Sequence, residues 1–310
     1  MTVLLTSLFL LGAAGEIDYE TLTFTSTHDQ TEQPARYYAS PKSGDQPLLV
    51  LLHSWSTDIN NYNPDDWVKV AREYGWHVVV PHFRGGNFNP EACASPAARQ
   101  DILDATAAVI QRYAVDTTRV YLAGSSGGGH MSMVMAAHSP QTWTAVSAWV
   151  GISNLTDWHA ETKASGRKYY KDIEACAGGA PGSSPEVDAQ LRARSPLFHI
   201  AAAKAIPLDL NAGVHDGHTG SVPTHHTLDA YNAVASALGE AAIPQSTINA
   251  LAQEIVPPEA PVVDETYERR IHLRETAGKC RVTIFEGGHE GLPKPACAWL
   301  AQHSGREQGK

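Results

Sequence analysis

Residues 119–130 read RVYLAGSSGGGH, and this stretch decides the fold of the chain. Its apolar first half predicts a strand at 120–124, the Gly and Ser residues predict a sharp turn, and a helix is predicted from 127 to 138. The turn contains the pattern G-x-S-x-G with Ser126 at its centre. Side chains two positions before and after the serine would clash in so tight a strand-to-helix turn, which pushes the serine hydroxyl into solvent. The stretch therefore predicts that Ser126 is a nucleophile.

The segments around this turn alternate between strand and helix patterns. Short Thr-rich and aromatic segments favour edge strands, whereas the solid apolar run PLLVLL favours a buried strand. Strands are predicted at 20–26, 35–39, 47–52, 76–81, 143–150, 207–213 and 280–285, and helices at 65–74, 96–114 and 295–303. This alternation is typical of an α/β fold with a mostly parallel, doubly wound central sheet flanked by helices. The first strands of the chain are expected to join this sheet in antiparallel orientation.

A long connection separates the strands predicted at 143–150 and 207–213. It exceeds a plain crossover, so we interpret residues 152–205 as a cap-like insertion over the C-terminal edge of the strands, where ligands bind in such sheets. No internal repeat or Pro/Gly/Ser-rich linker divides the chain. We expect a single catalytic domain over residues 16–310.

A serine hydroxyl needs a base, and the base needs a carboxylate to orient it. In this type of fold the order along the chain is serine, acid, histidine. Asp216 follows one predicted strand in GVHDGH, and His289 follows the last one in EGGHEG. Asp209 lies inside a predicted strand and His272 in a charged, helix-like run, which makes both weaker candidates. We therefore predict a catalytic triad of Ser126, Asp216 and His289.

Backbone N–H groups must face the charge that develops on the substrate carbonyl oxygen. Gly127 follows the nucleophile, and Trp55 lies in the segment HSWS after the strand at 47–52. We predict that the N–H groups of Gly127 and Trp55 form the oxyanion hole. Ser54 stands where a glycine is usual in such segments.

Arg84, Trp158 and Ser125 are candidates for contact with the substrate. For Arg84 the alternative is an ion pair with an acidic neighbour, and for Trp158 it is a place in the core or under the cap. The histidines at 215, 218, 225 and 226 have no carboxylate or cysteine at a recognised ligand spacing. The sequence therefore predicts no metal site and no cofactor.

Composition narrows the class of partner. The 23 basic and 33 acidic residues give a net charge of −10, and no basic cluster occurs, so a nucleic acid partner is excluded. The apolar run at 3–15 is shorter than the roughly 20 residues of a membrane span. Small residues at 13 and 15 predict a signal peptide at 1–15 and a secreted or periplasmic protein. The absence of Lys and Arg ahead of this run leaves a cytoplasmic protein as the alternative.

The four cysteines contain no CxxC pair. In an exported protein we expect the disulfides Cys280–Cys297, which are close in sequence, and Cys93–Cys176, which would pin the insertion. The alternative is four buried free thiols in a cytosolic enzyme.

Several stretches together carry a resemblance to a known family. They are PHFRG at 81–85, GSSGGGH at 124–130, VSAW at 146–149 and HDGH at 215–218. Over residues 45–303 the chain resembles the α/β-hydrolase superfamily, and these stretches are similar to its prolyl-oligopeptidase-like (S9-type) branch of serine hydrolases. Peptidases of that branch carry a large N-terminal β-propeller. Fewer than 50 residues precede the buried strand at 47–52, so we expect no propeller here, which weakens the transfer of peptidase activity.

The sequence thus predicts a secreted carboxylic ester hydrolase that works through an acyl-enzyme. Its expected substrate is a small-molecule ester or an ester linked to a polysaccharide, such as an acyl group on a plant polysaccharide. An S9-like serine peptidase that acts on small peptides, and a non-catalytic protein that binds a ligand in the cleft, are the alternatives. The sequence indicates nothing about the oligomeric state.

Overall fold

The computed structural model describes residues 17–256 and 262–305, so the predicted signal peptide lies outside the described residues. Within this part of the chain nine strands form one sheet in the order β1-β2-β4-β3-β5-β6-β7-β9-β8. Their bounds are β1 Glu20–Thr25, β2 Glu32–Tyr38, β3 Gln46–Leu52, β4 His77–Pro81, β5 Val115–Ser125, β6 Ala145–Trp149, β7 Leu208–Gly213, β8 Ile271–Ala277 and β9 Cys280–Phe285. The six central strands are parallel, whereas β1 and β2 at one edge and β8 at the other are antiparallel. The mostly parallel α/β fold predicted from the sequence is confirmed.

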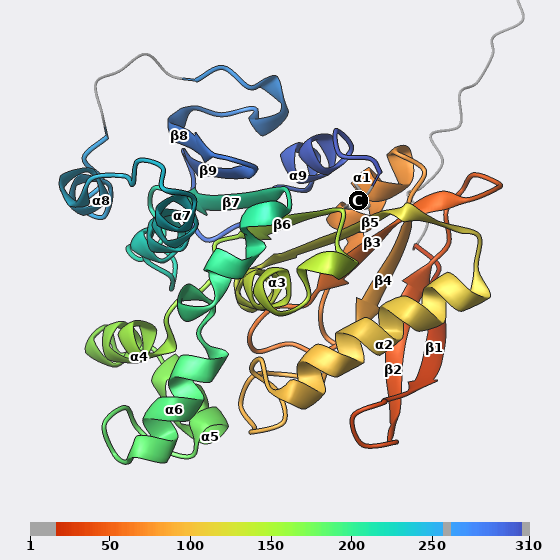
Figure 1. The fold of residues 1–310 in the computed structure, drawn as a ribbon, viewed down its shortest axis with the longest axis horizontal. Helices are drawn as coiled ribbons and strands as arrows, with labels where there is room; N and C mark the ends of the chain where they lie inside the picture. Colours follow the sequence, from red (N-terminus) through yellow and green to blue (C-terminus); the bar gives the residue numbers. More distant parts are fainter. Residues whose placement is uncertain (1–16, 257–261, 306–310) are drawn as a thin grey trace, which may run out of the picture.

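Helices cover both faces of this sheet (Figure 1). α1 and α9 pack against each other on one face, and α2, α3 and α7 lie on the other. Their bounds are α1 Asp65–Glu73, α2 Pro96–Arg112, α3 Gly127–His138, α7 His225–Leu238, α8 Gln245–Leu251 and α9 Pro293–Leu300. Because both faces are covered, β4, β6 and β7 are buried at every residue. None of the helices in the described residues is long and apolar enough to cross a membrane.

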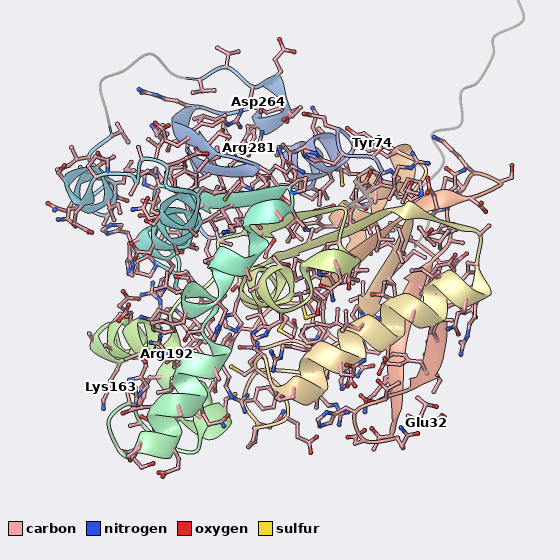
Figure 2. The ribbon with its side chains drawn as sticks, in the orientation of Figure 1. Glu32, Tyr74, Lys163, Arg192, Asp264 and Arg281 are labelled. Atoms are coloured by element: carbon pink, nitrogen blue, oxygen red, sulfur yellow. The ribbon has the colours of Figure 1, made fainter. Side chains whose placement is uncertain are left out.

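The predicted insertion folds into three helices that pack on one another. They are α4 Leu155–Ala164, α5 Tyr169–Ala177 and α6 Pro185–Arg194, and short 3-10 turns lead from them to β7. Figure 2 labels the exposed Lys163 and Arg192 on this part of the molecule. A separate buried apolar cluster joins the three helices to Trp55 in the loop after β3. The insertion therefore rests on the edge of the sheet where the parallel strands end.

The segment around His272 is a strand, and its prediction as a helix-like run was wrong. β8 pairs antiparallel with β9, and only the residues Gly278 and Lys279 join them. Gly278 has φ +52°, and a left-handed glycine in a two-residue loop is the mark of a tight hairpin. Charged side chains in β8 are accommodated because the strand lies at the edge of the sheet.

The predicted disulfides are not formed, because all four cysteines are free and buried. Cys93 and Cys176 belong to the same apolar cluster under the insertion. Burial and the neighbouring thiol of Cys176 raise the pKa of Cys93 well above its ordinary value. Burial likewise raises the pKa of Cys280 and Cys297, which lie in the main core. In this structure the thiols act as small apolar groups.

Candidate active site

The turn between β5 and α3 places Ser126 in an unusual backbone conformation. Its φ is +60° and its ψ −119°, a region that residues other than glycine rarely adopt. The N–H of Ser126 donates to the carbonyl oxygen of Trp149 at 2.9 Å. A Cβ on Gly124 would overlap the backbone of Gly128. A Cβ on Gly128 would overlap the backbone of Leu52, at the end of β3. The small residues of the G-x-S-x-G pattern are thus required by backbone contacts between β3, β5 and α3.

The structure brings the three predicted triad residues together. His289, in the loop between β9 and α9, has its Nε2 2.8 Å from Oγ of Ser126. Its Nδ1 lies 2.7 Å from Oδ2 of Asp216, which follows β7. The side chain of His289 is 24% exposed and that of Asp216 is fully buried. One imidazole therefore connects a buried carboxylate to a hydroxyl at the surface.

The loop after β7 folds back over the carboxylate of Asp216. Oδ1 accepts hydrogen bonds from the backbone N–H groups of Gly217 at 2.9 Å and Val222 at 3.0 Å. A Cβ on Gly220 would overlap both Asp216 and His289, so the loop passes close to both side chains. Two backbone N–H groups and the imidazole together satisfy the buried carboxylate of Asp216. These contacts keep its Oδ2 positioned to accept a hydrogen bond from Nδ1 of His289. The sequence motif HDGH predicted Asp216 as the acid, but no signal identified Gly220 or Val222 as its support.

The two predicted oxyanion donors lie next to each other. A Cβ on Gly127 would overlap the backbone nitrogen of Trp55, so the two segments are in direct contact. Neither backbone N–H has an acceptor among the described residues. Gly127 also begins α3, where the helix dipole favours negative charge. Both N–H groups are therefore available to an anion beside Ser126.

The side chain of Trp55 is anchored in the insertion. Its indole N–H donates to Oδ2 of Asp172 at 3.3 Å, and burial raises the pKa of that carboxyl. Its ring meets the ring of Trp158 edge to face, with centroids 4.7 Å apart. The insertion therefore fixes the loop that carries one of the two predicted oxyanion donors, a contact that the sequence did not reveal.

Of the three side chains predicted to contact the substrate, Arg84 and Trp158 have partners within the protein. Arg84 pairs with Asp101 at 2.6 Å and with Asp29 at 2.7 Å, which is the ion-pair alternative considered from the sequence. Trp158 is fully buried, and its indole N–H donates to the carbonyl of Ser221 at 2.7 Å. The hydroxyl of Ser125 is buried without a hydrogen-bond partner among the described residues. Substrate contact by Trp158 and Ser125 stays a prediction.

Asp209, set aside as an acid from its place inside a strand, is a structural carboxylate. It is fully buried and accepts hydrogen bonds from Ser147 at 2.9 Å and Asn211 at 2.8 Å. Arg281 of the neighbouring strand β9 pairs with it at 2.8 Å. The side chain thus joins three strands below the site.

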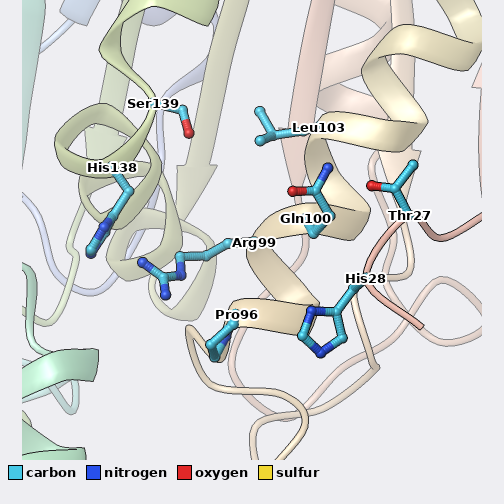
Figure 3. A pocket seen from close by; sticks show the side chains of 8 residues that line it. All are labelled: Thr27, His28, Pro96, Arg99, Gln100, Leu103, His138 and Ser139. Atoms are coloured by element: carbon cyan, nitrogen blue, oxygen red, sulfur yellow. The ribbon is translucent and has the colours of Figure 1, made fainter.

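A polar pocket of about 460 Å³ lies on another part of the molecule (Figure 3). It opens between the β1–β2 turn, the start of α2 and the end of α3, and Arg99 projects into it toward His138. Burial and the charge of Arg99 lower the pKa of His138 to about 4. Because Ser126 and His138 are at opposite ends of α3, this pocket does not belong to the triad.

The site lies at the C-terminal edge of the parallel strands. It combines the strained Ser126 with His289 and the buried Asp216, and the backbone N–H groups of Gly127 and Trp55 lie beside them. This fold and this site define a serine hydrolase. The sequence profile of the prolyl oligopeptidase family matches residues 65–241, more than half of the chain. The chain belongs to the prolyl oligopeptidase family, as its resemblance predicted.

Curated relatives include several esterases. The chain is 25% identical over 162 residues to acetylxylan esterase A of Aspergillus awamori, which covers 45% of this chain and 53% of the esterase. It is 25% identical over 187 residues to feruloyl esterase B of Talaromyces stipitatus, covering 57% of this chain and 45% of the esterase. The chain thus spans about half the length of these relatives.

Solved structures share the fold. Acylaminoacyl peptidase of Pyrococcus horikoshii superimposes with a TM-score of 0.64 at 16% identity, covering 96% of this chain and 43% of the peptidase. Dipeptidyl peptidase 4 of Porphyromonas gingivalis superimposes with a TM-score of 0.62 at 15% identity, covering 92% and 35%. This likeness shows the fold, whereas the family and the esterase relatives support a serine hydrolase that acts on an ester or a peptide bond.

Proposed function

We propose that the protein hydrolyses carboxylic esters through Ser126, His289 and Asp216. The observation that carries this proposal is the continuous hydrogen-bonded path from Oγ of Ser126 through the His289 ring to the buried carboxylate of Asp216. Asp216 accepts a hydrogen bond from Nδ1–H of His289, which leaves Nε2 as the base that faces the hydroxyl.

In the proposed first step Oγ of Ser126 attacks the ester carbonyl carbon while Nε2 of His289 takes the hydroxyl proton. The carbonyl oxygen becomes an anion, which accepts hydrogen bonds from the N–H groups of Gly127 and Trp55. When the tetrahedral intermediate collapses, the bond to the alcohol oxygen breaks and His289 gives its proton to that oxygen. The acyl group remains on Ser126 as an ester.

In the second step a water molecule attacks the acyl-enzyme. His289 takes one proton from the water and passes it to Oγ of Ser126 as the acyl bond breaks, which releases the acid and restores the free serine. Asp216 stabilises the imidazolium that forms in each step and keeps the ring oriented. The net reaction consumes one water and one ester and yields an alcohol and an acid.

The relatives favour an ester as the substrate. Two carry the names of esterases that act on acetylated xylan and on feruloyl esters, and a third is named poly(3-hydroxyalkanoate) depolymerase C. These names favour acyl esters on a polymer, and we propose a secreted enzyme that removes acyl groups from plant polysaccharides. A peptidase is the second candidate, because the matching family is that of prolyl oligopeptidase.

Ser126→Ala is expected to abolish both the hydrolysis of p-nitrophenyl acetate and covalent labelling by a fluorophosphonate, because only its hydroxyl contacts His289. Ser125→Ala is the matched control, since the neighbouring hydroxyl is buried and lacks a partner among the described residues. Labelling is measured by intact mass. A Ser126→Ala protein that still gains the mass of the reagent would contradict the assignment.

The substrate class is tested separately with the wild-type chain. We expect turnover of p-nitrophenyl acetate, methyl ferulate or acetylated xylan, and none of aminoacyl or prolyl p-nitroanilides. The opposite preference would favour the peptidase. Labelling of Ser126 without turnover of any of these substrates would leave the nucleophile in place and refute the proposed substrates.

A further inference from the structure

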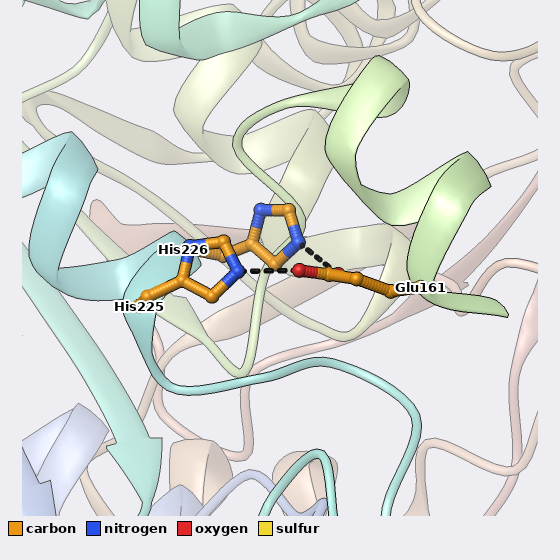
Figure 4. A group of neighbouring side chains, drawn as sticks. All are labelled: Glu161, His225 and His226. Carbon is orange, nitrogen blue, oxygen red and sulfur yellow. Dashed lines mark hydrogen bonds and ion pairs between the residues drawn. The ribbon is translucent and has the colours of Figure 1, made fainter. Parts of the chain in front are cut away.

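Three side chains meet where the insertion touches the main domain. Figure 4 shows Glu161, from α4, pointing toward the rings of His225 and His226 at the start of α7. Oε1 of Glu161 lies 2.6 Å from Nε2 of His225, and Oε2 lies 3.1 Å from Nε2 of His226. Among the described residues this is the one group of three such side chains whose ligand atoms all lie within 4.8 Å of one another.

The ring of His225 is oriented from behind by a second carboxylate. Its Nδ1 lies 2.9 Å from Oδ2 of Asp229, one turn further along α7. A metal-binding histidine commonly donates its remote N–H to a carboxylate in this way, which fixes the ring and makes the ligand nitrogen more basic. His225 therefore has the arrangement of a metal ligand, with Nε2 directed at Glu161 and Nδ1 held by Asp229.

The ring of His226 is held at its Nδ1 by the segment before α4. The backbone N–H groups of Ser153 and Asn154 donate to Nδ1 at 3.3 and 3.4 Å, and the hydroxyl of Ser153 lies at 3.3 Å. These donors favour a proton on Nε2, which Glu161 accepts. A metal ion at Nε2 must displace this proton to Nδ1. The two backbone N–H groups then have to turn away from the ring, and the Ser153 hydroxyl accepts the proton on Nδ1.

Exposure and charge suit a cation with room for water. The side chain of His226 is 1% exposed, whereas those of His225 and Glu161 are 23% and 30% exposed, so the group is closed on one side and open on the other. Glu161 and Asp229 supply two negative charges. Two imidazole nitrogens and one carboxylate form a donor set that zinc and related divalent transition metals prefer, with water completing a tetrahedron.

We propose that Glu161, His225 and His226 bind a divalent transition metal ion such as Zn²⁺, with Asp229 as the orienting residue behind His225. The sequence did not reveal the carboxylate that lies between these histidines, because Glu161 is 64 residues away from His225 in the chain. The ion would join α4 of the insertion to α7 of the main domain.

Such an ion would also brace the loop that holds the proposed catalytic acid. Trp158 lies one turn before Glu161 on α4, and its indole N–H donates to the carbonyl of Ser221. The next residue, Val222, donates its backbone N–H to Asp216. The metal site and the support of Asp216 therefore share α4 and the loop that leads into α7.

The experiment uses the full chain without a histidine tag, stripped of metal by a chelator. Titration with Zn²⁺ by calorimetry is expected to show one ion bound per chain, and Co²⁺ is expected to give a visible absorption band. Glu161→Gln and His226→Gln should abolish this binding. Asp229→Asn should weaken it by about 10- to 100-fold, the usual effect of losing an orienting partner.

His272→Gln is the matched control. Glu286 lies between His272 and His215, as Glu161 lies between His225 and His226. The ligand atoms of Glu286, His272 and His215 do not, however, all lie within 4.8 Å of one another. The His272→Gln substitution should leave zinc binding unchanged. The proposal is overturned if the wild-type chain binds no ion, if His272→Gln removes the binding, or if folded Glu161→Gln or Asp229→Asn protein binds zinc as the wild type does. Circular dichroism establishes that each variant is folded.

Discussion

Single residues at the site are constrained in two different ways. Ser126 has a positive φ, a strain that costs of order 1–3 kcal/mol and persists only where the surroundings impose it. The surroundings are the glycines of the turn, whose missing side chains let three backbone segments cross. Asp216 is instead held by hydrogen bonds. The sequence predicted the first constraint because glycine spacing records it directly, whereas backbone donors such as that of Val222 leave no mark on the sequence.

Asp216→Asn is expected to lower kcat by about 10⁴ with little change in Tm, because the amide leaves His289 in the wrong tautomer. Asp209→Asn should do the reverse. It should lower the free energy of unfolding by about 3–5 kcal/mol, since Arg281 loses its buried partner, while kcat changes little. Steady-state kinetics and urea unfolding of both variants measure this. A larger loss of kcat in Asp209→Asn would refute the assignment of the acid.

At the scale of helices and strands, the sequence predicted those features that neighbouring residues in the chain determine. α2 begins as expected, because Ser95 caps it by accepting the N–H of Ala98 and Pro96 occupies its first turn. β8 was missed because the charged residues of an edge strand hide the hairpin that Gly278 makes. The contacts of the insertion, among them Trp55 with Trp158, join residues far apart in the chain, and no local pattern reports such contacts.

Arg84 ties the β1–β2 turn to α2. Its side chain is 6% exposed, and it is the counter-ion of the fully buried Asp101. Arg84→Ala should therefore lower the free energy of unfolding by about 3–5 kcal/mol, as removal of one partner of a buried pair does. Arg119→Ala breaks a more exposed pair, with Asp116, and should cost about 0–1 kcal/mol. Urea unfolding compares the two.

KM distinguishes the ion-pair role of Arg84 from substrate binding. We expect KM for p-nitrophenyl acetate and for an acidic ester to be unchanged in Arg84→Ala protein that is still folded. A stable variant with a raised KM for the acidic ester alone would instead place Arg84 in contact with a substrate carboxylate.

In the whole molecule the site is assembled by topology. Because β3, β5, β7 and β9 are parallel, the loops after them open on the same edge, and these loops carry Trp55, Ser126, Asp216 and His289 in turn. The sequence could predict this convergence from the alternation of strands and helices. It could not predict which face of the insertion meets that edge, because the faces of α4–α6 are determined by packing against one another and against Trp55.

A second ionic cluster makes stability depend on pH. His215 contacts Glu254 at 2.8 Å and Glu286 at 2.7 Å, and these hydrogen bonds raise the pKa of His215 above 6.5. The same contacts, with His272, lower the pKa of Glu286 below 4.5. The stabilisation from His215 is complete below pH 6.5 and is lost as the pH rises through its raised pKa. That from Glu286 is complete above pH 4.5 and is lost as the pH falls through its lowered pKa.

His215→Gln should therefore lower Tm most between pH 4.5 and 6.5, with a difference from wild type that shrinks toward pH 9. Thermal unfolding followed by circular dichroism at pH 5.5, 7 and 9 measures the difference. Glu254→Gln, which removes one of the two carboxylates, should show a smaller loss with the same trend. A loss of Tm that grows with pH would contradict this account.

The serine turn and the acid loop differ in how they can come apart. Separating the crossing backbones around Ser126 requires the central strands to part, which amounts to global unfolding. The loop from Gly217 to Thr224 is held by a few hydrogen bonds and by the buried side chain of Val222, so it can open without parting the central strands. We therefore expect warming to displace Asp216 first while Ser126 stays in place, so that activity fades before the fold melts.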